Sequence, residues 1–205
     1  MDKTNVAVLL FEDVEVLDFA GPFEVFSRVR TLPGLESRWN EDTAPFNVFT
    51  VAKTAEPISA IANMMVIPDH GFETAPRIDI LVVPGGLGAR ALLDDEETLT
   101  WIKSVDESTS LTTSVCTGSL VLAKAGLLAG RTATSHWGAL EALGQIDQSI
   151  TVDKTSRFVD DGIMTSAGVS AGIDMSLHIV EQRCGVDVAN DTARFMDYPR
   201  AQAAA

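Results

Sequence analysis

Residues 112–128 read TTSVCTGSLVLAKAGLL, a run rich in β-branched residues followed by a run rich in Ala and Leu. β-branched residues favour strands, whereas Ala and Leu favour helices, so the segment predicts a strand that leads into a helix. Cys116 stands at the junction, where Gly118 permits a tight turn. We therefore expect a cysteine held on an elbow between a strand and a helix.

Two interpretations of Cys116 follow from this placement. Its sulfur would face the partly positive end of a helix that begins near Gly118 or Ser119, where a thiolate is stabilised and acts as a nucleophile. Alternatively, Cys116 is a small buried apolar residue, as many free cysteines are. The position between strand and helix favours the nucleophile.

Strand-like and helix-like segments alternate along the rest of the chain. Strands are expected at residues 6–11, 46–52, 80–83, 111–115 and 132–135, helices at 22–30, 96–108, 119–125, 137–143 and 173–184, and a hairpin at 150–165. Alternation indicates βαβ units, and the almost wholly apolar runs VAVLLF and IDILVVP are typical of central strands covered on both faces. The sequence predicts an α/β fold with a doubly wound, flavodoxin-like, mostly parallel sheet. The polar segment 31–45 is expected to be an irregular surface insertion.

Composition limits the classes of function. The 205 residues are 46% hydrophobic and no linker-like tract divides them, which predicts one domain over residues 1–205. The net charge of -14 repels phosphate backbones and anionic membranes, so we expect neither as a partner. The apolar run from Val6 ends at Glu12 and is too short for a signal peptide or a membrane span. We expect a cytoplasmic protein in which Cys116 and Cys184 stay unpaired.

Three loops besides the elbow follow predicted strands, where ligands bind in doubly wound sheets. Asp18 precedes a helix whose first position fits Pro22, and it either caps this helix or exchanges protons beside Cys116. Gly85 and Gly86 either form an ordinary turn or bring backbone N–H groups to a developing negative charge. His136 either enters the same cleft or is a structural residue.

The other two histidines carry no catalytic signal. His70 is expected in a turn, and His178 follows Asp174 by four residues, which predicts a surface ion pair on a helix. The three histidines lack the spacing of a metal site, so no metal is expected.

Four segments together resemble one family: LDFAGPFEVF, DILVVPGG, SVCTGSLVLAKAGLLAGRTATSHW and TSAGVSAGIDM. They are similar to the ThiJ/PfpI superfamily, within the class I glutamine amidotransferase-like fold, and most of all to its isonitrile hydratase branch. This resemblance implies a cysteine nucleophile that attacks R–N≡C and a carboxylic acid that supplies the proton. Water then releases an N-substituted formamide. It also implies a small-molecule substrate, a homodimer, and no cofactor.

The resemblance gives roles to individual residues. It implies that Cys116 is the nucleophile, that Asp18 is the general acid and base, and that Thr117 positions the substrate or the attacking water. Substrate-binding positions are implied for Gly85, Gly86, His136, Ser166 and Ala167. The hydratase branch would have a more glycine-rich loop at Ser166 and Ala167, and these residues alternatively begin the last helix, with Ser170 or Asp174 as its cap.

Other branches of the superfamily fit less well. Protease-like members have His after the cysteine, where this chain has Thr117, and glutamine amidotransferases have Gly where it has Ser114. Glyoxalase or deglycase members use Glu at the position of Asp18, although Glu15 and Glu24 lie nearby in the sequence. AraC-type regulators use a similar domain as a non-catalytic sensor ahead of a helix-turn-helix module. Because the chain ends at Ala205 and is acidic, the enzyme is the favoured interpretation.

Overall fold

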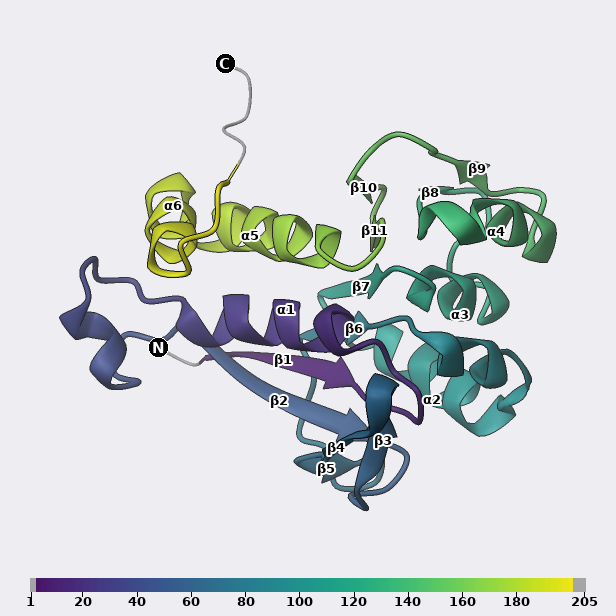
Figure 1. Ribbon diagram of the computed structural model, residues 1–205, viewed down its shortest axis with the longest axis horizontal. Helices are drawn as coiled ribbons and strands as arrows, with labels where there is room; N and C mark the ends of the chain where they lie inside the picture. The colour runs from purple at the N-terminus through teal and green to yellow at the C-terminus, as the bar shows by residue number, and fades with distance from the viewer. Residues whose placement is uncertain (1–2, 201–205) are drawn as a thin grey trace.

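The computed structural model describes residues 3–200, so the ends of the predicted 1–205 domain lie outside the described residues (Figure 1). Its centre is a seven-stranded sheet of order β10-β11-β7-β6-β1-β2-β5. The strands are β1 (Thr4–Leu9), β2 (Phe46–Ala52), β5 (His70–Gly71), β6 (Ile80–Val83), β7 (Leu111–Val115), β10 (Phe158–Asp160) and β11 (Met164–Ser166). Every pairing is parallel except β10 with β11. The predicted mostly parallel α/β fold is confirmed.

Helices form a layer on each side of this sheet (Figure 1). One layer contains α1 (Val16–Arg28), α5 (Ala171–Cys184) and α6 (Val186–Phe195), with α5 packed between the other two. The second contains α2 (Glu96–Asp106), α3 (Gly118–Lys124) and α4 (Leu140–Ile146), with α3 in contact with both neighbours. Strand β6 is buried at all four positions, as expected for a central strand covered on both faces.

Strand order determines where a site forms. The chain leaves β1 toward β2 on one side and returns to β6 on the other, so the topological switch point lies between β1 and β6. The segments that follow β1, β6 and β7 meet at this edge. Asp18, Gly85 and Cys116 come from these three segments.

Helix α1 begins earlier than predicted. Its first residue is Val16, so Pro22 lies inside the helix and Asp18 lies in its first turn. Burial of an apolar face that includes Phe19, Val25 and Phe26 extends the helix toward its N-terminus. Pro22 has no N–H to donate to the carbonyl of Asp18 four residues earlier, a loss that this burial offsets.

The predicted hairpin at 150–165 is correct only in its second half. Strands β10 and β11 pair antiparallel, whereas β9 (Thr151–Val152) pairs parallel with β8 (Thr132–Ala133) in a separate small sheet. The predicted helix at 137–143 is divided into a 3-10 turn η4 (Trp137–Ala139) and α4.

Several elements were not predicted. They are α6, the hairpin of β3 (Ile58–Ala60) and β4 (Met64–Val66), and the 3-10 turns η1 (Glu36–Trp39), η2 (Ile61–Asn63) and η3 (Leu87–Asp94). The segment 31–45 is thus not merely irregular, because it contains η1 and the buried Arg38. His70 lies in β5 rather than in a turn.

The expected pairing of His178 with Asp174 is also wrong. Asp174 binds Arg157 and accepts a hydrogen bond from the hydroxyl of Tyr198 at 3.0 Å. The His178 ring lies 4.9 Å from that of Phe158, and its Nε2 is 3.0 Å from Gln182. The stronger guanidinium donor therefore takes the carboxylate.

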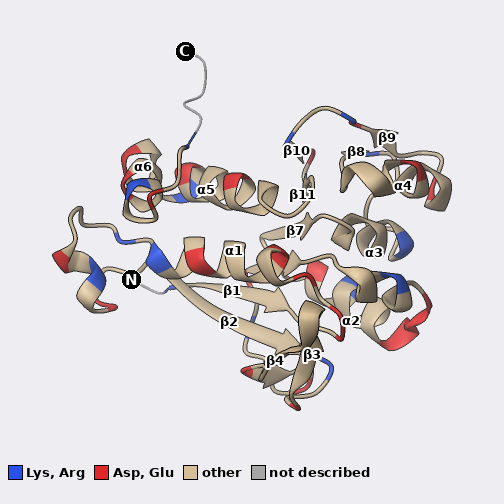
Figure 2. Ribbon diagram, viewed as in Figure 1, with Lys and Arg blue, Asp and Glu red and all other residues tan. Residues whose placement is uncertain are grey.

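No helix among residues 3–200 is long and apolar enough to cross a membrane. Acidic residues are spread over the helices and outer loops, whereas the strands of the sheet contain few charged residues (Figure 2). This separation is expected when the sheet is the core.

Candidate active site

Cys116 lies on a strained elbow between β7 and α3. Its φ of 57° is in the left-handed region, which costs a non-glycine residue about 1–3 kcal/mol. Hydrogen bonds of both its N–H and its carbonyl group fix this conformation. The Cys116 N–H donates to the carbonyls of Ser166 and Ala167 at 3.1 and 3.2 Å, and its carbonyl accepts from the hydroxyls of Ser119 and Ser135 at 3.1 and 3.0 Å. The thiol is therefore presented in one direction.

Gly118 explains how the elbow approaches the loop after β6. A Cβ atom at this position would overlap the carbonyl oxygen of Val83. Only glycine lets the start of α3 lie directly against that backbone. This contact brings Gly85 and Gly86 next to Thr117.

Asp18 faces the thiol from α1. The residue is fully buried, and its Oδ2 accepts the Gly85 N–H at 3.0 Å. The carboxyl contacts the Cys116 thiol, while Oδ1 is buried with no well-formed hydrogen bond from the described residues. Burial raises the pKa of Asp18 from 3.8 to about 7, against the opposing effect of the Gly85 N–H. Asp18 therefore retains a proton over part of the neutral range.

The thiol is not the low-pKa group that its place before a helix predicts. Burial, followed by the negative charge of Asp18, raises the pKa of Cys116 to about 12. The N–H groups of Thr117 and Val169 act in the opposite direction but are outweighed. Helix α3 has only seven residues, so its dipole is small compared with an adjacent carboxylate.

Together these two groups share a proton. While Asp18 is ionised, the proton resides on sulfur, because two adjacent buried negative charges repel. When Asp18 is protonated, its charge no longer raises the pKa of Cys116. The pair can therefore deliver a proton from one group as the other forms a bond.

Thr117 is bound to the Gly85–Gly86 turn. Its hydroxyl oxygen accepts the Gly86 N–H at 3.0 Å and is 3.2 Å from the Gly86 carbonyl, to which it can donate. The N–H groups of Gly85 and Gly86 thus hold the side chains of Asp18 and Thr117. Their role toward a substrate, expected from the sequence, stays a prediction.

Val169 is a neighbour of the thiol and the carboxyl that the sequence reasoning missed. It has a φ of 51°, rare for a β-branched residue, and its N–H acts to lower the pKa of both Cys116 and Asp18. Only its position, shortly after β11, could have indicated this contact. Ser166 ends β11 and Ala167 follows it, so neither begins α5, the helix predicted at 173–184, which starts at Ala171. Ser170 precedes that helix without a side-chain capping hydrogen bond.

His136 lies beside this segment rather than against the thiol. Its Nδ1 accepts the Gly138 N–H at 3.2 Å, and its ring packs so closely on Gly168 that a Cβ there would overlap it. It lines a cavity of about 390 Å³ together with Trp137 and Val169. A role for His136 in binding a substrate remains a prediction.

Both cysteines are free. Within residues 3–200, no group of three or more His, Cys, Asp or Glu side chains is placed to hold a metal ion.

Known proteins are similar to this chain over most of its length. Isonitrile hydratase of Pseudomonas putida is 35% identical over 194 residues, which cover 95% of this chain and 78% of the relative. The HTH-type transcriptional regulator GbdR of Pseudomonas aeruginosa is 26% identical over 197 residues, covering 96% of this chain but only 51% of the regulator.

Solved structures agree with the sequence relatives. A THiJ/PfpI family protein from Pseudomonas syringae superposes with a TM-score of 0.83 at 30% identity, covering 98% of this chain and 78% of that one. Drosophila melanogaster DJ-1beta shares the fold, with a TM-score of 0.80 at 21% identity over 97% of this chain and 100% of its own. The model of the DJ-1/PfpI family matches residues 4–182. The chain therefore belongs to the DJ-1/PfpI family.

Proposed function

We propose that this protein is a cofactor-free isonitrile hydratase, which adds water to R–N≡C and yields an N-substituted formamide. The observation that carries the proposal is the buried Asp18 carboxyl in contact with the Cys116 thiol, with a pKa raised to about 7. The 35% identity to an isonitrile hydratase over 95% of the chain supports the same chemistry. A lyase of this kind needs a nucleophile and a proton donor at one carbon atom, and the pair provides both.

The first step forms a bond between Cys116 Sγ and the terminal carbon of the isocyanide. A proton reaches the same carbon from the Cys116–Asp18 pair, which gives the thioimidate R–N=CH–S–Cys116. The isocyanide is neutral and so is the thioimidate, and the single proton of the thiol is the one transferred. Burial favours this step because no net charge is created in the low-dielectric site.

The second step uses water. Ionised Asp18 accepts a proton from a water molecule as the water oxygen attacks the thioimidate carbon, and Asp18 passes this proton to the nitrogen. The C–S bond then breaks, sulfur takes the remaining proton of the added hydroxyl group, and R–NH–CHO leaves with Asp18 ionised again. In this proposal Thr117, whose hydroxyl accepts the Gly86 N–H, positions the water. The sum of both steps converts R–NC and H₂O into R–NH–CHO, and it needs no oxidant or reductant.

The test is formamide production from a small alkyl isocyanide, followed by mass spectrometry. Wild type and Cys184→Ala are expected to turn over equally, because Cys184 lies at the end of α5, outside the site. Cys116→Ala should lose activity while its circular dichroism spectrum stays unchanged. Undiminished turnover by Cys116→Ala would refute the proposal.

A sensor function is the second candidate, because the GbdR relative matches 96% of this chain with only 51% of its own length. A sensor would bind a small molecule near Cys116 without converting it. Wild type that makes no formamide from a panel of isocyanides, yet protects Cys116 from alkylation when one of them is added, would favour this function.

We further propose that the protein is a homodimer working in the reducing cytoplasm. Free Cys116 and Cys184 suit such a compartment. Exposed apolar side chains at Leu17 of α1 and at Met64 and Met65 of β4 support an interface between copies.

A further inference from the structure

A second cavity lies beside η3, the 3-10 turn that follows β6. Its volume is about 300 Å³, at the lower end of the range for small-molecule sites. It opens at the carboxyl ends of β1 and β2, between β3, η3 and the start of α2. Asp18, Cys116 and Thr117 are not among its lining residues, so it is separate from the candidate active site.

The cavity walls are apolar. Leu9, Leu10 and Phe11 of the β1 segment form one side, and Ile58, Phe72 and Leu92 form the others. The hydroxyl of Thr98, a polar group on the wall, donates to Asp95 at 2.9 Å and is therefore already satisfied. The interior thus suits an aliphatic or aromatic body that makes no hydrogen bonds.

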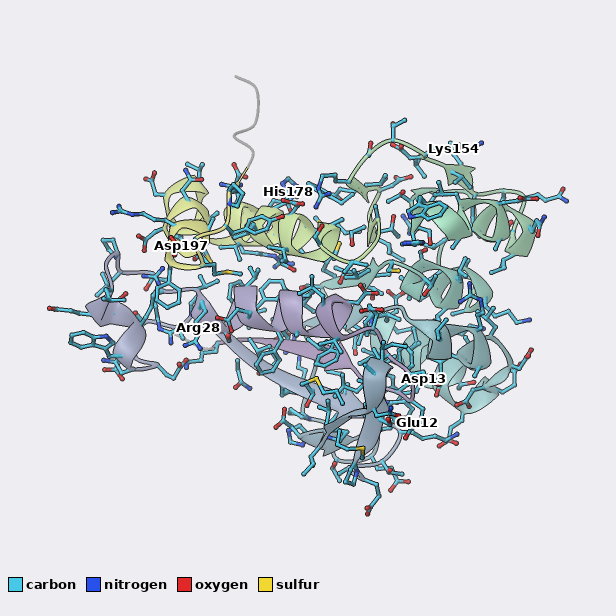
Figure 3. All side chains as sticks on the ribbon, viewed as in Figure 1. Glu12, Asp13, Arg28, Lys154, His178 and Asp197 are labelled. Atoms are coloured by element: carbon cyan, nitrogen blue, oxygen red, sulfur yellow. The ribbon has the colours of Figure 1, made fainter. Side chains whose placement is uncertain are left out.

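The rim is acidic. Lys53 lies there but is bound to Asp95 at 3.3 Å and to Glu97 at 2.7 Å, so two carboxylates share one ammonium. Glu12 is exposed, accepts the Ser59 N–H at 3.0 Å, and has no cationic partner within residues 3–200. Figure 3 shows Glu12 beside β3, in the lower right part of the view, whereas His178 and Lys154 lie in the upper part. A positively charged group at the mouth would meet an unneutralised carboxylate.

We propose that this cavity binds a small amphiphilic amine, with its apolar body between β1 and η3 and its ammonium group at Glu12. The charge of the rim selects the amine over a neutral or anionic molecule of the same shape. The apolar walls select it over a small hydrophilic cation.

Backbone contacts join this cavity to the active site. Gly88 lines the cavity and its N–H donates to the Asp13 carbonyl at 3.2 Å, while the Asp13 N–H donates to the Ser59 carbonyl at 2.7 Å. One residue on, Val14 forms a β-bridge with Gly86, whose N–H holds Thr117. An occupant that touches Gly88 therefore touches the segment that positions the side chain next to Cys116. We expect occupancy to change the reactivity of Cys116.

The probe is cyclohexylmethylamine, with cyclohexylmethanol as its neutral counterpart. Each is titrated into protein with labelled Ile and Leu methyl groups, and the resonances of Ile58 and Leu92 are followed. The amine should shift both resonances saturably and bind several-fold more tightly than the alcohol. Absence of saturable shifts, or equal affinity for amine and alcohol, would overturn the proposal.

Matched variants locate the site. Ala91→Trp places an indole at the exposed cavity mouth and should abolish binding, whereas Ala129→Trp, exposed elsewhere, should not. Glu12→Gln retains an acceptor for Ser59 and should remove the preference for the amine, whereas Glu56→Gln changes the net charge equally and should keep it. Identical binding by Ala91→Trp and Ala129→Trp, both folded by circular dichroism, would contradict the location.

The coupling is measured without assuming hydratase activity. Saturating amine should change the rate of Cys116 alkylation by iodoacetamide about five-fold or more, a common size for coupling between sites. Cys116→Ala should still bind the amine, which separates this site from the catalytic one. Binding with an unchanged alkylation rate would refute the coupling, and loss of binding in Cys116→Ala would refute the separate site.

Discussion

Asp18 and Cys116 belong to different layers of the fold, and burial makes them a single titrating pair. The sequence was sufficient to select both residues, because each follows a predicted strand. It was not sufficient to predict their pKa values, which depend on burial and on N–H groups of Gly85, Thr117 and Val169. These groups come from distant segments that only the folded chain brings together.

Replacing Asp18 by Asn should make the protein more stable above neutral pH. Because its pKa rises from 3.8 to about 7 on folding, folded protein binds more protons between these values, and stability falls as pH rises through them. The loss is on the order of 4 kcal/mol. Asp18→Asn should unfold at higher urea concentration than wild type at pH 8 and show little advantage at pH 4. An equal difference at both pH values would contradict the raised pKa.

The same pKa predicts how activity depends on pH. Because the reactive Cys116–Asp18 pair holds a single proton, kcat/KM should rise about ten-fold per pH unit below pH 7 and level off above it. The profile of formamide production between pH 5 and 9 measures this. A rate that falls as the pH rises above 7 would contradict the one-proton pair.

At the scale of elements, the strand, elbow and helix around Cys116 were predictable because the residue types change abruptly there. The early start of α1 was not, since Pro22 is a strong local signal for a helix start and tertiary burial outweighs it. Strand β9 was paired wrongly because two-residue strands carry too little pattern to define a partner. Helix α6 was missed because it follows α5 directly at Gly185.

Gly118→Ala should disturb the elbow, because the new methyl group would overlap the carbonyl oxygen of Val83 in rigid backbone. We expect a loss of about 1–3 kcal/mol in unfolding free energy and loss of formamide production. Gly144→Ala is the control. Gly144 lies inside α4, and a Cβ there would be 3.5 Å from the side chain of Val152, an ordinary van der Waals contact. That variant should gain about 0.5–1 kcal/mol. Equal stability of the two variants in urea would argue against the elbow packing.

Arg30 holds the segment 31–45 in place. Its guanidinium is fully buried and donates to the carbonyls of Ser37 and Asn40 at 3.2 and 2.9 Å, and it pairs with Glu41 at 2.5 Å. Arg30→Met should cost about 1–3 kcal/mol, because the carbonyls of Ser37 and Asn40 lose their donor, and should admit protease within this segment. Arg30→Lys should not restore stability, because an ammonium lacks the planar set of donors. Urea unfolding within 1 kcal/mol of wild type for Arg30→Met would contradict this role.

At the scale of the whole molecule, charge and exposed apolar groups define how the protein meets others. Acidic residues cover its helices and loops (Figure 2), consistent with the net charge of -14. The β3–β4 hairpin, which the sequence did not reveal, carries Met64 and Met65 with 50% and 63% of their surface exposed. This hairpin also forms part of the second cavity through Ile58. The exposed methionines and the second cavity were not predictable, because both depend on where the β3–β4 hairpin lies and the sequence did not predict this hairpin.

The proposed homodimer should depend on this hairpin. Sedimentation velocity is expected to show a dimer at micromolar concentration for wild type. Met65→Glu places a carboxylate on each side of a two-fold interface and should shift the equilibrium toward monomer by repulsion. A monomeric wild type would contradict the dimer, and an unaffected variant would place the interface elsewhere.

The central claim is that substrate becomes covalently attached to Cys116. The most direct measurement is rapid mixing with cyclohexyl isocyanide, an acid quench within milliseconds to seconds, and mass spectrometry of the cysteine peptides. We expect a transient gain on the Cys116 peptide equal to the mass of the isocyanide, with none on the Cys184 peptide. Formamide released with no adduct on Cys116 at any time, and at the same rate by Cys116→Ala, would contradict it.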